Sequence, residues 1–143
     1  MMNVAYTLGR IFVPIVFIVA GIQKLLNVSS VARMIENSRI PVPDAITPYL
    51  AGVPKYQALG YLVGAIELIC GLMILIGLKA RWGALVLAVF TASTIILFHN
   101  FWEMEGAAAA MNQTEALKNL SILGGLLLLV AGGSGSSSYD RRA

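Results

Sequence analysis

The side chains best suited to chemistry in this sequence are a few charged or titratable residues set in long apolar runs. Glu67 lies near the middle of the run LGYLVGAIELICGLMILIGL, which is as long as a membrane span. Arg10 interrupts an earlier run, and the only histidine, His99, follows a third. A charge at the centre of a membrane helix is costly, so it usually faces a bundle interior and has a partner. The fold must therefore supply partners for these groups.

The first predicted partners are Arg10 and Glu67, as an intramembrane ion pair. If the chain crosses four times, Arg10 lies about six residues and Glu67 about eleven residues from the same end, a difference of roughly 7 Å that an arginine can bridge. Gly60, Gly64 and Gly71 share a helical stripe with Glu67, which indicates close helix packing. The pair would fix the helix register. The alternative is a proton relay, which requires Glu67 to titrate near neutrality.

A second constellation is predicted at the opposite end, where three spans bring Lys24, His99 and Lys118 to similar depth beside Asn100 and Asn119. Ammonium and imidazole groups in a partly dry site would attract a small anion or donate hydrogen bonds to a quinone carbonyl. His99 is the candidate proton exchanger, since imidazole is the side chain that exchanges protons near neutral pH. The alternative is that these groups reach the lipid headgroups independently.

Composition excludes several classes of protein. The chain has 143 residues, of which 58% are hydrophobic and 12% charged, with a mean hydropathy of +0.81, whereas soluble domains carry about 25% charge. It is therefore predicted to be an integral membrane protein in contact with the lipid bilayer. The net charge of +3 is scattered, which argues against nucleic-acid binding. The chain has one cysteine, Cys70, and one histidine, which are too few for an internal disulfide, a CxxC pair or a Cys/His metal site. We expect no intrinsic cofactor.

The apolar runs have the length of helices, so an all-α, integral membrane four-helix bundle in one domain is predicted. A cleaved signal peptide is the alternative for the first run, and it is disfavoured because Arg10 lies inside a run of span length. The predicted spans cover residues 4–26, 56–78, 82–101 and 115–132, and a polar connection covers residues 27–55.

Within that connection, apolar residues at helical spacing over 31–36 predict a short amphipathic helix at the interface, with a surface loop as the alternative. Residues 46–53 are apolar but too short to span, so they are predicted to dip into the mouth of the bundle. Four spans place both termini on the side of the basic turn at Lys79 and Arg81. Because that turn and the tail concentrate basic residues, we expect both termini to be cytoplasmic.

Several segments together resemble the DoxX family of small four-span bacterial membrane proteins. They are the early arginine, GIQKL at 21–25, ELICGLMILIGL at 67–78, FHNFW at 98–102 and KNLSILGG at 118–125. The tail GGSGSSSYDRR is also similar to the family's ending, which favours native sequence over an artificial linker. The connection between Pro43 and Tyr56 is longer than in the family pattern, and this affects the predicted shape of the mouth.

The resemblance implies a location in the bacterial inner (plasma) membrane and a link to membrane redox and sulfur metabolism, because the family is named after a membrane component of a thiosulfate:quinone oxidoreductase. The function expected is a membrane subunit that binds quinone or a small anion at a polar mouth. It would be at most one subunit of a quinone-linked oxidoreductase, in a homo-oligomer or with other membrane subunits. The alternative is a non-enzymatic scaffold that docks partner helices on small-residue faces. A transporter is disfavoured because no inverted repeat is evident.

Overall fold

A computed structural model, described here for residues 2–38 and 42–135, consists of helices joined by short connections. Four of the helices are long and apolar enough to cross a membrane, and no strand occurs in the described ranges. This confirms the predicted all-α, four-span fold. The elements in chain order are α1 (Met2–Leu26), α2 (Val28–Asn37), the 3₁₀ helix η1 (Asp44–Tyr49), α3 (Lys55–Ile76), α4 (Ala80–Phe98), the 3₁₀ helix η2 (Phe101–Glu103) and α5 (Gly106–Gly132).

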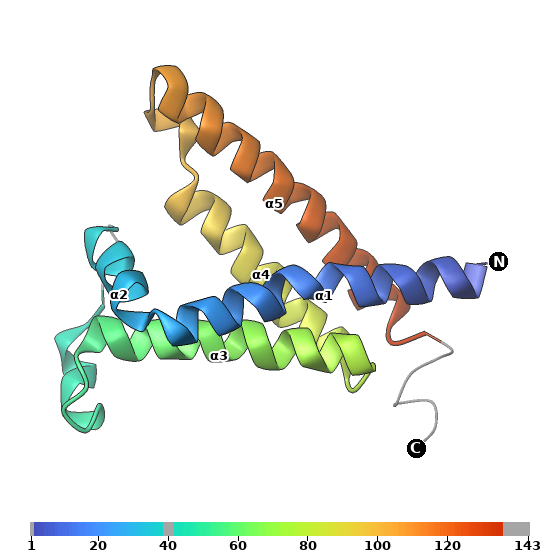
Figure 1. The fold of residues 1–143 in the computed structure, drawn as a ribbon, viewed down its shortest axis with the longest axis horizontal. Coiled ribbons are helices and arrows are strands. Elements are labelled where there is room, and N and C mark those ends of the chain that lie inside the picture. Colours follow the sequence, from blue (N-terminus) through green and yellow to red (C-terminus); the bar gives the residue numbers. More distant parts are fainter. Residues whose placement is uncertain (1, 39–41, 136–143) are drawn as a thin grey trace.

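The four long helices are arranged as two antiparallel pairs that diverge from one end. α1 packs along α3, α4 packs along α5, and α3 joins the pairs by packing on α4, whereas α1 and α5 touch only slightly. Figure 1 shows the N-terminus, the α3–α4 turn and the end of α5 at the narrow end, with α2 and the start of α5 at the wide end. The bundle is therefore splayed rather than closed.

At the narrow end the pairs meet in a dry core. Ile74 of α3, Leu87 of α4 and Leu126 of α5 have no exposed surface, and Phe17 of α1 is also buried. Leu78 follows α3, and Gly77 adopts a left-handed conformation that ends this helix. This reverses the chain within the short turn to α4.

Glycines set the register between α1 and α3. A methyl group built on Gly21 would lie 2.8 Å from the Gly64 carbonyl oxygen and 2.8 Å from the Leu68 amide nitrogen, and one on Gly71 would lie 2.8 Å from Ile18. The two backbones can approach this closely only because side chains are missing at the contact. The part of the small-residue stripe at Gly64 and Gly71 is thus occupied by α1.

The polar connection begins with a helix, as predicted for residues 31–36. Val31, Ala32 and Ile35 are the buried side chains of α2, which packs against α3. The apolar segment after Pro43 forms η1 against α3, at the outer end of the molecule in Figure 1, and not in the space between the helix pairs. Lys55 Nζ lies 2.5 Å from Asp44 Oδ1, and this ammonium lowers the pKa of the Asp44 carboxyl.

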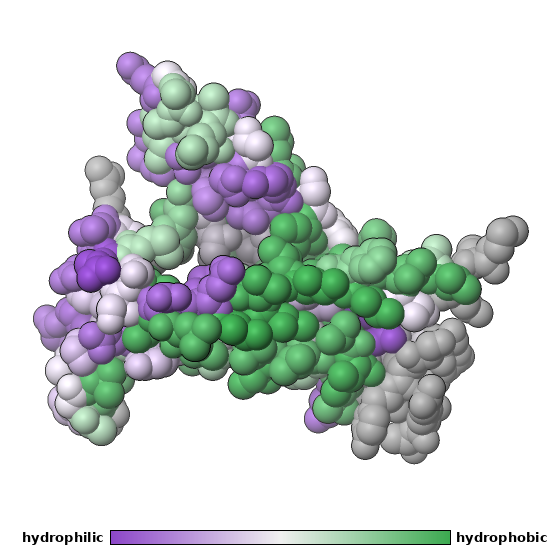
Figure 2. Space-filling model, viewed as in Figure 1, coloured by the Kyte–Doolittle hydropathy of each residue, from purple (hydrophilic) through white to green (hydrophobic). Residues whose placement is uncertain are grey.

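The fourth long helix begins at Gly106, nine residues before the predicted start at 115. The alanine run that follows is a strong helix former, so it extends the helix beyond the apolar part. Figure 2 shows hydrophobic residues covering the middle of α1 and α3, with hydrophilic residues gathered over α2 and the first half of α5. This distribution fits a bilayer around the middle of the bundle and water at the wide end. The tail from residue 136 lies outside the described residues.

Candidate functional site

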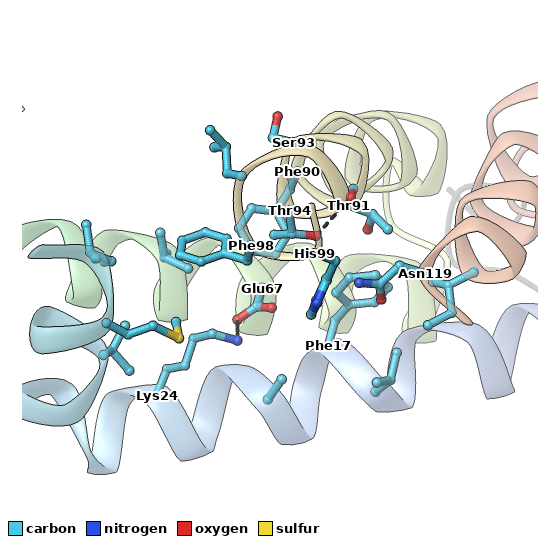
Figure 3. Close-up of a pocket in the computed structure, with 18 of the residues that line it drawn as sticks. Phe17, Lys24, Glu67, Phe90, Thr91, Ser93, Thr94, Phe98, His99 and Asn119 are labelled. Carbon is cyan, nitrogen blue, oxygen red and sulfur yellow. Dashed lines mark hydrogen bonds and ion pairs between the residues drawn. The ribbon is translucent and has the colours of Figure 1, made fainter. Parts of the chain in front are cut away.

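A cavity of about 470 Å³ lies where the two helix pairs diverge. Its walls are mostly aliphatic and aromatic side chains, including Phe17 of α1, Ile35 of α2, Val63 of α3, and Phe90 and Phe98 of α4. Its polar residues come from four elements (Figure 3). They are Lys24, Glu67, Thr91, Ser93, Thr94, His99 and Asn119. The arrangement has the form of a small-molecule site, an apolar cavity with a few placed polar groups.

The strongest polar feature of the cavity is an ion pair between α1 and α3. Lys24 Nζ lies 2.6 Å from Glu67 Oε2, and the side chains are 23% and 4% exposed. Glu67 therefore has its counter-ion inside the bundle, as a carboxylate at this depth requires. Lys24 runs along α1 from the end of the helix, with its aliphatic stem on the cavity wall and its ammonium turned inward (Figure 3).

The predicted Arg10–Glu67 pair is wrong. Gly21 lies against Gly64 and Leu68, so in this antiparallel register Glu67 is opposite positions close to Gly21, about ten residues or 15 Å along α1 from Arg10. Lys24 is only a few residues away, and helical side chains lean toward the N-terminus, which carries its ammonium to Glu67.

Arg10 instead stabilises the other end of α3. It is 4% exposed, and its Nη1 donates hydrogen bonds to the Ile74 carbonyl at 3.0 Å and the Leu75 carbonyl at 2.7 Å. The last carbonyls of a helix lack intrahelical donors and carry the negative end of the helix dipole. The α3 carbonyls therefore gain a hydrogen-bond donor, and the buried guanidinium of α1 gains acceptors.

We expect Arg10→Leu to lower the free energy of unfolding by about 1.5–3 kcal/mol, the range for hydrogen bonds made by a charged group. The measurement is thermal unfolding in mild detergent. Arg10→Lys is the matched control. It should lose less free energy of unfolding, because an ammonium can keep a hydrogen bond to one of the two carbonyls. Equal melting temperatures for the wild type and Arg10→Leu would contradict this role.

Two other predicted mouth residues line the cavity. His99 follows α4 as its cap residue, and its Nδ1 lies 3.3 Å from Asn112 Oδ1 of α5. Asn119 of α5 reaches the same cavity from the next turns of that helix. Figure 3 shows the His99 ring and the Asn119 side chain in the cavity with Phe17 and the Lys24–Glu67 pair. The structure thus brings together Lys24, His99 and Asn119, together with Glu67.

The remaining two predicted mouth residues lie outside the cavity and have local partners. Lys118 Nζ lies 2.5 Å from Glu115 Oε1 on the exposed face of α5. Asn100 Nδ2 donates a hydrogen bond of 2.8 Å to Glu103 Oε2. Both contacts join residues three apart, so each side chain is satisfied within its own segment.

Sequence reasoning missed the hydroxyl groups of α4. Thr91 and Thr94 lie on the same face as Phe98, with helical spacings of three and four residues, and all three line the cavity. That spacing was visible in the sequence, but hydroxyls in an apolar helix gave no signal of their own because they ordinarily bond to their own backbone.

Comparison with known proteins places this architecture in a family. The profile of the DoxX family matches residues 5–100, which contain nearly all of α1, the whole of α2 to α4 and every cavity residue except those of α5. The chain belongs to the DoxX family. DoxX membership confirms the resemblance found in the sequence.

The relatives of this DoxX protein include two from Escherichia coli K12. It is 34% identical to the inner membrane protein YqjF over 97% of this chain and 92% of that protein, and 28% identical to the inner membrane protein YphA over 94% and 87%. It is also 29% identical to the uncharacterized membrane protein Rv3486 of Mycobacterium tuberculosis, over 93% of this chain and 77% of that protein. No solved structure matches the chain. It is a membrane protein similar to inner membrane proteins.

Proposed function

We propose that this DoxX protein binds a quinone in the cavity between its helix pairs and acts there as the membrane subunit of a redox or sulfur-metabolism assembly. The observation that carries the proposal is the cavity itself, in which apolar walls enclose Lys24, Glu67, His99 and Asn119. A quinone has the matching chemistry, an apolar ring and tail with carbonyl oxygens that accept hydrogen bonds.

The pairing of the lysines favours a quinone over a small anion. Lys24 is neutralised by Glu67 at 2.6 Å, and Lys118 is neutralised by Glu115 at 2.5 Å outside the cavity. An anion entering the cavity would meet no net positive charge from these lysines, and it would also lose its hydration among apolar walls. A neutral ring loses little hydration and still gains hydrogen bonds from the ammonium and imidazole groups.

His99 is the residue we propose to exchange a proton with the bound ring. Its Nδ1 faces the Asn112 side-chain oxygen at 3.3 Å, which can orient the imidazole while the other ring nitrogen serves the cavity. Reduction of a quinone to a quinol consumes two electrons and two protons. The electrons would come from a partner subunit, His99 would pass on one proton, and water at the wide end of the bundle would supply the other.

The scaffold alternative loses part of the surface on which it depended. Gly64 and Gly71 of α3 already contact α1, and Gly60 lies against Val28 and Val31 of α2. These small residues therefore pack elements of the same chain, and the stripe they form offers no free face to a partner helix.

The proposal is tested by titrating the purified protein in mild detergent with a decyl-substituted para-benzoquinone, followed by calorimetry. We expect His99→Leu and Asn119→Leu each to weaken binding about tenfold, as the loss of one hydrogen bond implies. Lys118→Met is the matched control at the same end of the bundle, and it should bind as the wild type does. If the wild type binds no quinone, or if all variants bind equally, this function is wrong.

A further inference from the structure

One hydroxyl group in the cavity wall makes no hydrogen bond within the described part of the chain. Thr91 of α4 is 2% exposed, and its Oγ1 is buried without a hydrogen-bond partner among the described residues. Burying a hydroxyl without a partner destabilises a protein, whereas a valine would fill nearly the same volume without that cost.

The neighbouring hydroxyls of the same helix behave differently. Ser93 Oγ donates to the Val89 carbonyl at 2.9 Å, and Thr94 Oγ1 donates to the Thr91 carbonyl at 2.8 Å. Such bonds to the preceding turn are the usual way in which serine and threonine are accommodated in an apolar helix. Thr91 makes no such bond, so its donor and acceptor capacity is left for something in the cavity that it lines.

The position of Thr91 separates it from the charged groups of the site. It projects from α4, whereas the ion pair joins Lys24 of α1 to Glu67 of α3, and Figure 3 shows these groups on different walls of one cavity. A ligand with a single polar head would satisfy one of these walls and leave the other unpaired. A ring with oxygens on two edges would satisfy both.

Resting on the proposed function, we infer that Thr91 is a specificity-determining residue whose hydroxyl bonds the second oxygen of a ring with two oxygens. The first oxygen of that ring faces Lys24 and His99. The site therefore selects rings with oxygens on opposite edges over fatty acids and other lipids with a single polar head. Phe17 and Phe90 provide the apolar contacts to the ring between the two polar walls.

The test compares two probes of similar shape, a decyl-substituted para-benzoquinone and decylbenzene, on the full-length protein in detergent. Thr91→Val should weaken quinone binding about tenfold, for the loss of one hydrogen bond, and leave decylbenzene binding unchanged or stronger. The same variant should melt at an equal or higher temperature without ligand, because a hydroxyl with no partner in the protein is removed. Binding and stability thus change in opposite directions, which a purely structural role would not produce.

Ser121→Ala is the control, since it removes from α5 a hydroxyl that is already bonded to its own helix and lies outside the cavity. It should leave the ratio of quinone to decylbenzene affinity unchanged. If Thr91→Val binds quinone as tightly as the wild type, or loses both probes equally, the inference is wrong while the proposed function stands. If the wild type binds neither probe, the proposed function fails, and this inference fails with it.

Discussion

Gly21→Ala is expected to lower the free energy of unfolding by about 3 kcal/mol, at the upper end of the cost of overpacking a tight contact. The added methyl group would lie 2.8 Å from both the Gly64 oxygen and the Leu68 nitrogen. These are backbone atoms of α3, so no side-chain rotation can relieve the clash and the two helices must separate. Thermal unfolding in detergent measures the loss.

Two other glycines provide the control for this prediction. Gly9 of α1 and Gly124 of α5 have nothing within 4 Å of an added methyl group. Alanine at either position should raise stability by about 0.5–1 kcal/mol, because alanine loses less backbone entropy in a helix. If Gly21→Ala has the same melting temperature as these two variants, the close contact between α1 and α3 does not set the register.

The number of spans could be predicted because each is a physical necessity of the bilayer. A run of about twenty apolar residues must form a helix to satisfy its backbone in hydrocarbon, and the sequence has four such runs. The predicted span began at 115 because the apolar part begins there, and the alanine run before it is helical for its own propensity and not for burial.

The partner of Glu67 could not be found from depth alone. Counting residues from the span ends placed Arg10 close enough in depth to reach Glu67, but the actual register is set by the contact of Gly21 with Gly64. The glycines of that stripe were recognised in the sequence, yet nothing in it stated which turn of α1 they would meet. Lys24 was assigned to the mouth for the same reason.

The cavity required the splay of the helix pairs, which is a property of all four helices together. Which of the mouth residues would line it could not be read from local spacing. Lys118 and Asn100 each have a carboxylate three residues away and pair with it. His99 and Asn119 have the same carboxylates, Glu103 and Glu115, four residues away, yet both line the cavity.

Lys24→Met is expected to be among the most damaging single substitutions, lowering the free energy of unfolding by about 3–5 kcal/mol, the usual cost of removing one partner of a buried ion pair. Methionine keeps the aliphatic stem, so packing is preserved and the loss comes from Glu67, which is 3% exposed and would keep no counter-ion from α1. Arg10 cannot replace the lysine, since it is held at the far end of α3.

Glu67→Gln, which removes the other partner, should lower the free energy of unfolding less, because Lys24 is not as deeply buried as Glu67. The lysine side chain is 23% exposed, so after Glu67→Gln the ammonium can turn toward the wide end of the bundle, where water is near. The double variant Lys24→Met/Glu67→Gln should recover most of the loss, as two neutral groups leave no unpaired charge and the two changes couple strongly. Lys118→Met, on the exposed pair of α5, is the matched control and should change stability by less than about 0.5 kcal/mol. Additive losses in the double variant, or a larger loss for Glu67→Gln than for Lys24→Met, would show that the buried carboxylate does not depend on this lysine.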